Sequence, residues 1–98
     1  MMKELDFILK GKDDFLKYLK LKFTMLHQSN FFYRDFHYGI LSFLHEHGHR
    51  IDRLKADTVA HALLTEFERN GIAKRIDHQT WTLNYPEFAL PRIEKKPV

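Results

Sequence analysis

The chain has 98 residues, of which 44% are hydrophobic and 14% aromatic, with a net charge of +3 and no cysteine. This length and composition predict one domain with an aromatic-rich core and exclude a chain that is disordered throughout. The absence of cysteine excludes disulfides and thiolate chemistry, and no apolar run approaches the roughly 20 residues of a membrane helix, so we expect a cytoplasmic protein.

Three segments are predicted along the chain. Residues 1–12 form an N-terminal arm, because Gly11 separates a short apolar stretch from the first helix. Residues 13–86 form the domain, in which the first helix runs from about Asp14 to His27 with Asp13 as its N-cap. Residues 87–98 form a Pro-containing C-terminal tail outside the regular fold.

The first predicted helix has an apolar arc wider than half of its circumference. The arc contains Phe15, Leu16, Tyr18, Leu19, Leu21, Phe23, Met25 and Leu26. Such a helix is either central to its own core or shared between its domain and a partner. The second alternative predicts a homodimer built partly on this helix, with Leu21 at the interface.

Two further helices are predicted. The second begins after Ser29 or Asn30 as its cap, ends at Gly48, and turns Phe36, Ile40, Phe43 and Leu44 inward. The third runs from about Ala56 to Arg69 and turns Val59, Ala60, Leu63, Leu64 and Phe67 inward. The polar stretch "HRIDRLKAD" connects them.

A β-hairpin is predicted after the third helix. Asn70-Gly71 ends that helix, and the strands "IAKRI" (residues 72–76) and "TWTLN" (residues 80–84) flank the turn "DHQ". Alternation along the strands predicts that Ile72 and Ile76 share one face and that Trp81 and Leu83 lie on the opposite one.

The stretch "LLTEFERNGIAKRIDHQTWTLN", residues 63–84, resembles the end of a winged-helix domain, and the resemblance covers about residues 33–85. It implies an α+β fold in which a three-helix core is followed by a β-hairpin wing, with Trp81 sealing the hairpin against the helices. In that family the third helix is usually the recognition helix, and the wing reaches the adjacent DNA backbone or minor groove. Another α+β domain is the alternative.

A histidine-rich motif, "HEHGHR", raises the question of a metal site, because imidazoles are good ligands for zinc, nickel and copper. Helical geometry separates His45 from His47, and Gly48 should end the helix before His49. We therefore predict capping or surface roles and no metal or other cofactor. The sequence also has no phosphate-binding glycine loop, "H-E-x-x-H" or "G-x-S-x-G", so no enzymatic activity is expected.

The predicted DNA-binding residues are Lys55, Thr58, His61, Lys74, Arg75 and His78. Thr58 and His61 should lie nearest the bases at the start of the third helix, while the hairpin residues should contact phosphates. Arg50 and Arg53 could add phosphate contacts from the preceding loop. Because the outward face of this helix is nearly neutral and carries Glu66 and Glu68, the affinity for DNA should be modest.

Two functions remain open at this stage. The first is a small winged-helix DNA-binding protein that acts as a dimeric transcriptional regulator. The second is a winged-helix-like protein-protein interaction module, which would use the apolar surface of the first helix or the tail residues Phe88, Leu90 and Ile93. A solvated charged surface that keeps the protein soluble would also account for the basic residues.

Overall fold

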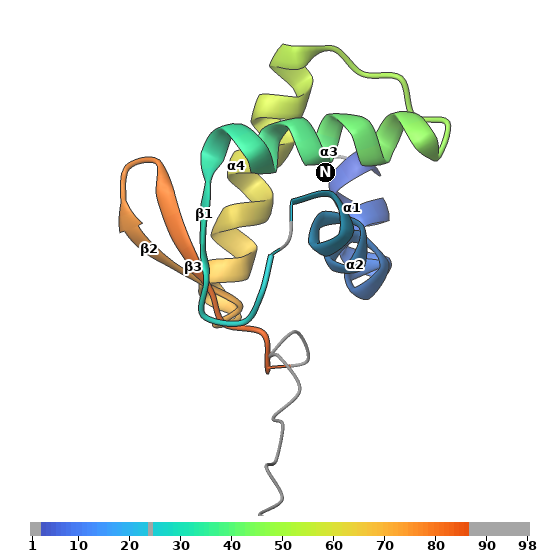
Figure 1. Cartoon of the computed structure of the whole chain (residues 1–98). Helices are drawn as coiled ribbons and strands as arrows, with labels where there is room; N and C mark the ends of the chain where they lie inside the picture. Colours follow the sequence, from blue (N-terminus) through green and yellow to red (C-terminus); the bar gives the residue numbers. More distant parts are fainter. Residues whose placement is uncertain (1–2, 24, 87–98) are drawn as a thin grey trace, which may run out of the picture.

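The computed structural model describes residues 3–23 and 25–86, which form four helices and a three-stranded antiparallel sheet (Figure 1). In chain order the elements are α1 (Lys3–Lys10), α2 (Lys12–Phe23), β1 (Asn30–Phe32), α3 (Tyr33–Glu46), α4 (Arg53–Arg69), β2 (Ala73–Asp77) and β3 (Thr80–Leu83). The fold is therefore α+β, with a helical core followed by a β-hairpin, as the sequence predicted. None of these helices is long and apolar enough to cross a membrane.

The sheet lies on one side of the helices, next to α3 and α4 (Figure 1). Its strand order is β1-β3-β2, so the last strand in sequence is the central one. Phe31 and Arg75 are the register partners of Trp81 on its two sides. Phe31, Trp81 and Leu83 are each less than 5% exposed, which identifies the face that packs against the helices. Trp81 thus seals the hairpin against the helices, as expected.

The core is aromatic, and the predicted inward faces of the second and third helices are confirmed. Every residue predicted to point inward from these two helices is buried. Phe36 of α3 packs edge-on against Phe15 of α2, with ring centroids 5.9 Å apart, and against Phe67 of α4, at 6.1 Å. Such edge-to-face pairs stabilise a small core beyond the area that they bury.

The N-terminal segment differs from the predicted arm, because residues 3–10 form helix α1. Ile8 is fully buried, and Leu5, Phe7 and Leu9 are partly buried against the core. The i, i+3, i+4 spacing of Leu5, Ile8 and Leu9 is the helical signal that the prediction passed over. The core therefore includes residues before position 13.

The segment between α2 and α3 also corrects the prediction. Helix α2 ends at Phe23 instead of His27, and Asn30–Phe32 form strand β1 instead of beginning a helix. The backbone of β1 pairs with β3, and Thr82 Oγ1 donates a hydrogen bond to Asn30 Oδ1 over 2.9 Å. A strand of three residues is too short to show alternation, and its partner lies about fifty residues away, so local pattern could not reveal it.

Helix α4 begins earlier than predicted because Asp52 caps it. The Asp52 carboxylate accepts a hydrogen bond from the Lys55 backbone N–H over 2.8 Å, so Arg53 to Lys55 belong to the first turn. At the other end of the helix, Gly71 adopts a left-handed conformation with φ of 78°. The Ile72 N–H donates to Phe67 O over 2.8 Å, and the Gly71 N–H donates to Glu68 O over 3.2 Å. This is a Schellman ending, which confirms Asn70-Gly71 as the stop.

The hairpin register departs from simple alternation. The strands pair Arg75 with Trp81 and Asp77 with Thr80, so a register shift occurs at Ile76. Ile72 is buried, but Ile76 is 52% exposed, so the prediction that the two share one face is wrong. Such bulges depend on cross-strand pairing, which period-two alternation along one strand cannot show.

Neighbouring helices use most of the wide apolar arc of α2. Phe15, Leu16 and Leu19 are fully buried, whereas Leu21 is 87% exposed. Gly39 of α3 allows the close approach, since a Cβ there would overlap the Leu19 side chain and lie 3.4 Å from Phe23. The apolar arc is therefore mostly that of a central helix. Within it, Leu21 stays exposed and could contact a partner.

Tyr85 ties the end of the described chain to α2. Its backbone N–H donates to His27 Nδ1 over 3.0 Å, and its hydroxyl donates to the Asp13 carboxylate. Tyr85 is nearly buried and belongs to the core. The predicted tail, residues 87–98, lies outside the described residues.

Candidate nucleic-acid interface

One side of α4 is exposed along the whole helix. At 100° per residue, this outer face consists of Leu54, Thr58, His61, Thr65, Glu68 and Arg69. The opposite side supplies the core residues from Val59 to Phe67. Thr58 and His61 thus lie on an open surface, where the sequence placed them.

The carboxylates of α4 are bonded within the protein. Glu68 accepts a hydrogen bond from Trp81 Nε1 over 2.7 Å, and Glu66 accepts one from Arg69 over 3.1 Å. Asp57 accepts from the Tyr33 hydroxyl and lies 3.5 Å from His61 Nε2. Each carboxylate thus has a partner on α4 itself, on α3 or on the hairpin, although its negative charge still acts on the surroundings.

Tyr33, at the start of α3, organises the N-terminal half of the outer face. Its ring stacks between His61 and His37, with centroid distances of 5.0 Å and 5.8 Å. Burial, and then the bond to Asp57, raise the pKa of the Tyr33 hydroxyl well above its ordinary value. The phenol therefore stays protonated and donates, and it holds Asp57 and His61 in place.

The threonine hydroxyls of the outer face are directed to the helix backbone. Thr58 Oγ1 donates to Leu54 O over 3.2 Å, and Thr65 Oγ1 donates to His61 O over 3.0 Å. Each hydroxyl proton is therefore used within the helix. Both threonines are exposed residues.

The hairpin carries the predicted cations on different sides. Arg75 lies over the Trp81 ring, with its guanidinium carbon 5.3 Å from the centroid, on the side that faces α4. Lys74 is the neighbour of Arg75 in the strand and pairs with Thr82, so it lies on the other side of the sheet. His78 is exposed in the turn, next to Asp77. Hydrogen bonds from the turn, first from the Gln79 backbone N–H (2.9 Å), lower the pKa of Asp77.

Lys55 takes a different direction from the rest of the predicted set. Its Nζ lies 3.7 Å from a carboxylate oxygen of Glu4, which is nearly buried on α1. Lys55 therefore sits at the border between α4 and α1. The structure brings Thr58 and His61 together, fixes Arg75 beside α4, and separates Lys55 and Lys74 from them.

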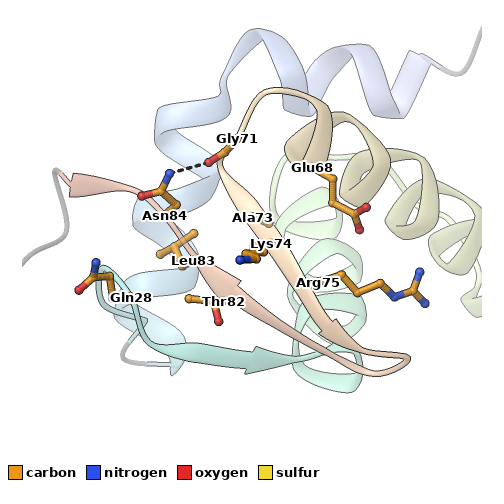
Figure 2. Close-up of a pocket in the computed structure, with 9 residues that line it drawn as sticks. All are labelled: Gln28, Glu68, Gly71, Ala73, Lys74, Arg75, Thr82, Leu83 and Asn84. Carbon is orange, nitrogen blue, oxygen red and sulfur yellow. Dashed lines mark hydrogen bonds between the residues drawn. The ribbon is translucent and has the colours of Figure 1, made fainter.

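A pocket of about 560 Å³ lies over the base of the hairpin (Figure 2). Its lining residues are Gln28, Glu68, Gly71, Ala73, Lys74, Arg75, Thr82, Leu83 and Asn84. Asn84 Nδ2 donates to Gly71 O over 2.8 Å, which closes one end, and Arg75 and Glu68 stand at the other. The lining contains no nucleophile paired with a base.

The histidines of "HEHGHR" have separate contacts. His47 Nδ1 lies 2.9 Å from Phe43 O at the end of α3, and His45 Nε2 lies 3.2 Å from Ile51 O. The His49 ring packs at a tilt against Phe7 of α1, with the ring centroids 4.6 Å apart. Within residues 3–23 and 25–86, no group of three or more His, Cys, Asp or Glu residues could hold a metal ion.

Comparisons with protein-family models, with curated proteins and with solved structures found no match to this chain. The surface of α4 and the hairpin is therefore the main guide to function. Three of its features escaped the sequence analysis: exposed Leu54, the Tyr33 stack and the Trp81–Glu68 bond. Among these features, only the alignment of Leu54 with Thr58 has a local signal, which is their i, i+4 spacing. That spacing indicates a shared helix face only if the helix begins after Asp52, as it does in the structure.

Proposed function

We propose that this chain is a winged-helix protein that binds duplex DNA through the outer face of α4 and the hairpin, and acts as a cytoplasmic transcriptional regulator. The observation that carries the proposal is the junction of the two elements. Trp81 Nε1 donates to Glu68 over 2.7 Å, and Arg75 lies over the same indole ring. A cation on the hairpin is thereby held beside the exposed helix.

The mechanism follows from this arrangement. An exposed helix fits the major groove, while cations beside it neutralise phosphates and set its position on the duplex. Arg75 and His78 would contact phosphates from the hairpin, and Thr58 and His61 would lie nearest the bases, whereas Lys74 lies on the other side of the sheet. The charges of Asp57, Glu66 and Glu68 oppose the DNA backbone, so we expect modest affinity.

Fluorescence-polarisation titration of mixed-sequence duplex DNA at two low salt concentrations tests the proposal. We expect Arg75→Ala to weaken binding to every duplex alike and to lower the salt slope by about one, because one phosphate contact is lost. Lys17→Ala is the matched control, since Lys17 is exposed on α2, on the other side of the helices from the sheet (Figure 1). Binding no tighter than ~10⁻⁴–10⁻⁶ M at low salt, the range of non-specific contact, rejects the proposal.

A second candidate, a protein-protein interaction module, is favoured by one observation. An apolar groove of about 460 Å³ lies where α3 meets the start of α4, and Leu41, Ile51 and Leu54 line it. Apolar grooves of this kind receive side chains of partner proteins. The predicted homodimer also stays a proposal, and it now depends on two exposed residues, Leu21 of α2 and Tyr38 of α3.

A further inference from the structure

The outer face of α4 is poor in free hydrogen-bond donors along its first three turns. Thr58 and Thr65 donate to carbonyls of their own helix, at 3.2 Å and 3.0 Å. His61 stacks on Tyr33, and its Nε2 lies 3.5 Å from Asp57. A helix that reads base edges by hydrogen bonds presents free amide, guanidinium or ammonium groups there, and this face presents none before Arg69.

The same face exposes an apolar side chain in its first turn. Leu54, in the first turn, is 79% exposed, and Thr58, which is also exposed, follows it one turn later with its hydroxyl turned back to Leu54 O. Thr65 repeats the arrangement two turns further on. A single exposed leucine is ordinary, but a leucine aligned with two threonines whose hydroxyls turn back to the helix forms an apolar stripe.

We infer that this stripe reads thymine C5-methyl groups in the major groove, with Leu54 as the principal contact and Thr58 as the second. Thymine is the one natural base that presents a methyl group in that groove, and apolar side chains are its usual partners. The inference rests on the proposed DNA binding and adds its specificity. It predicts a preference for A·T-containing sites that arises from methyl contact and not from hydrogen bonds.

The test compares duplexes that differ only in those methyl groups. An A·T-rich duplex is titrated in thymine and uracil forms, and a G·C-rich duplex in cytosine and 5-methylcytosine forms. Each contacted methyl buries about one CH₂ equivalent, so we expect about fourfold weaker binding for each contacted thymine that becomes uracil, and a gain when cytosine is methylated. The second pair separates methyl contact from any effect of uracil on duplex flexibility.

Variants at two positions assign the effect to side chains. Leu54→Ala should bind the thymine duplex about as weakly as the wild type binds the uracil duplex, and should lose most of the discrimination. Thr58→Val, which keeps a methyl group, should retain discrimination, whereas Thr58→Ser should reduce it. Lys17→Ala is the control, because Lys17 is exposed on α2 and belongs neither to the stripe nor to the proposed dimer contact, and it should keep the wild-type discrimination.

The outcomes separate the inference from the proposal beneath it. Salt-dependent binding with equal affinity for thymine and uracil duplexes overturns thymine reading and leaves DNA binding intact. Discrimination that persists in Leu54→Ala also overturns the inference, because the methyl contact then lies elsewhere. No duplex binding at low salt overturns both and leaves Leu54 to the apolar groove that it shares with Leu41 and Ile51.

Discussion

Two surfaces of the molecule each expose a leucine but arrange their polar groups differently. On the α2–α3 surface, polar groups of one helix bond to polar groups of the other. We define this surface by Tyr18, Leu21 and Lys22 of α2 and Tyr38, Ser42 and Glu46 of α3. The Tyr18 hydroxyl contacts Ser42 and donates to Glu46 over 3.2 Å. On the outer face of α4 the threonine hydroxyls bond within the helix, and Glu68 bonds to the hairpin.

This difference shows that a residue type does not determine what a surface offers to a partner. Lys22 counts as a free cation in the sequence, but its Nζ lies 5.3 Å and 5.9 Å from the ring centroids of Tyr18 and Tyr38. The interaction with Tyr18 raises the pKa of Lys22. Thr58 counts as a hydrogen-bond donor, yet its proton is used inside α4. The destination of each hydrogen bond decides which groups stay available.

The largest expected effect on stability concerns the helix contact beneath the α2–α3 surface. Gly39→Ala should lower the free energy of unfolding by about 1–2 kcal/mol, because the added methyl overlaps Leu19 and the gain in helix propensity offsets only part of the overpacking. Urea denaturation measures it. Gly11→Ala is the control and should stay within about 0.5 kcal/mol, since a Cβ there meets only Phe7 O at an ordinary 3.7 Å. Equal stability of Gly39→Ala and wild type would show that the close approach is not needed.

A smaller effect is expected where α3 supports the outer face of α4. Tyr33→Phe should cost about 1 kcal/mol at neutral pH, because the hydroxyl no longer donates to Asp57. The pKa of Tyr33 is raised on folding, so its contribution is complete below about pH 10 and is lost as pH rises through the folded value.

The pH dependence provides a second measurement of the same contact. When the pH is raised from 8 to 11, the free energy of unfolding should fall further for the wild type than for Tyr33→Phe. Tyr38→Phe serves as the control, because Tyr38 is 53% exposed, and it should follow the wild type. Parallel curves for wild type and Tyr33→Phe would contradict the role given to the Tyr33–Asp57 bond.

The smallest effect on stability is expected at the exposed residues Leu21 and Leu54. At Leu21 we also expect a large effect on dimer formation. Leu21→Glu should leave the unfolding free energy within about 0.5 kcal/mol, as for other exposed positions, but should convert the proposed homodimer to a monomer. Sedimentation at several concentrations measures the mass. Leu54→Glu is the matched control and should remain dimeric. If the wild-type chain sediments as a monomer at every concentration, the proposal of a homodimer is wrong.

Local pattern determined most of the helical part of this protein. The inward residues of α3 and α4 were predictable because burial on a helix repeats every three to four residues. The end of α4 was predictable because Asn70-Gly71 provides the left-handed glycine that a Schellman ending requires. The α+β class and the hairpin followed from the strands after that stop. Helix α1 carried the same kind of signal and was overlooked.

Only the tertiary structure decided the features that depend on residues far apart in the chain. Strand β1 exists because β3 pairs with it, and Ile76 is exposed because the hairpin register shifts beside it. Lys55 faces Glu4 of α1, and Glu68 is bonded to Trp81, although neither pairing has a signature in the sequence. Hydrogen bonds and side-chain packing between distant segments form only when the chain has folded, and they determine which side chains of α4 remain free to meet a partner.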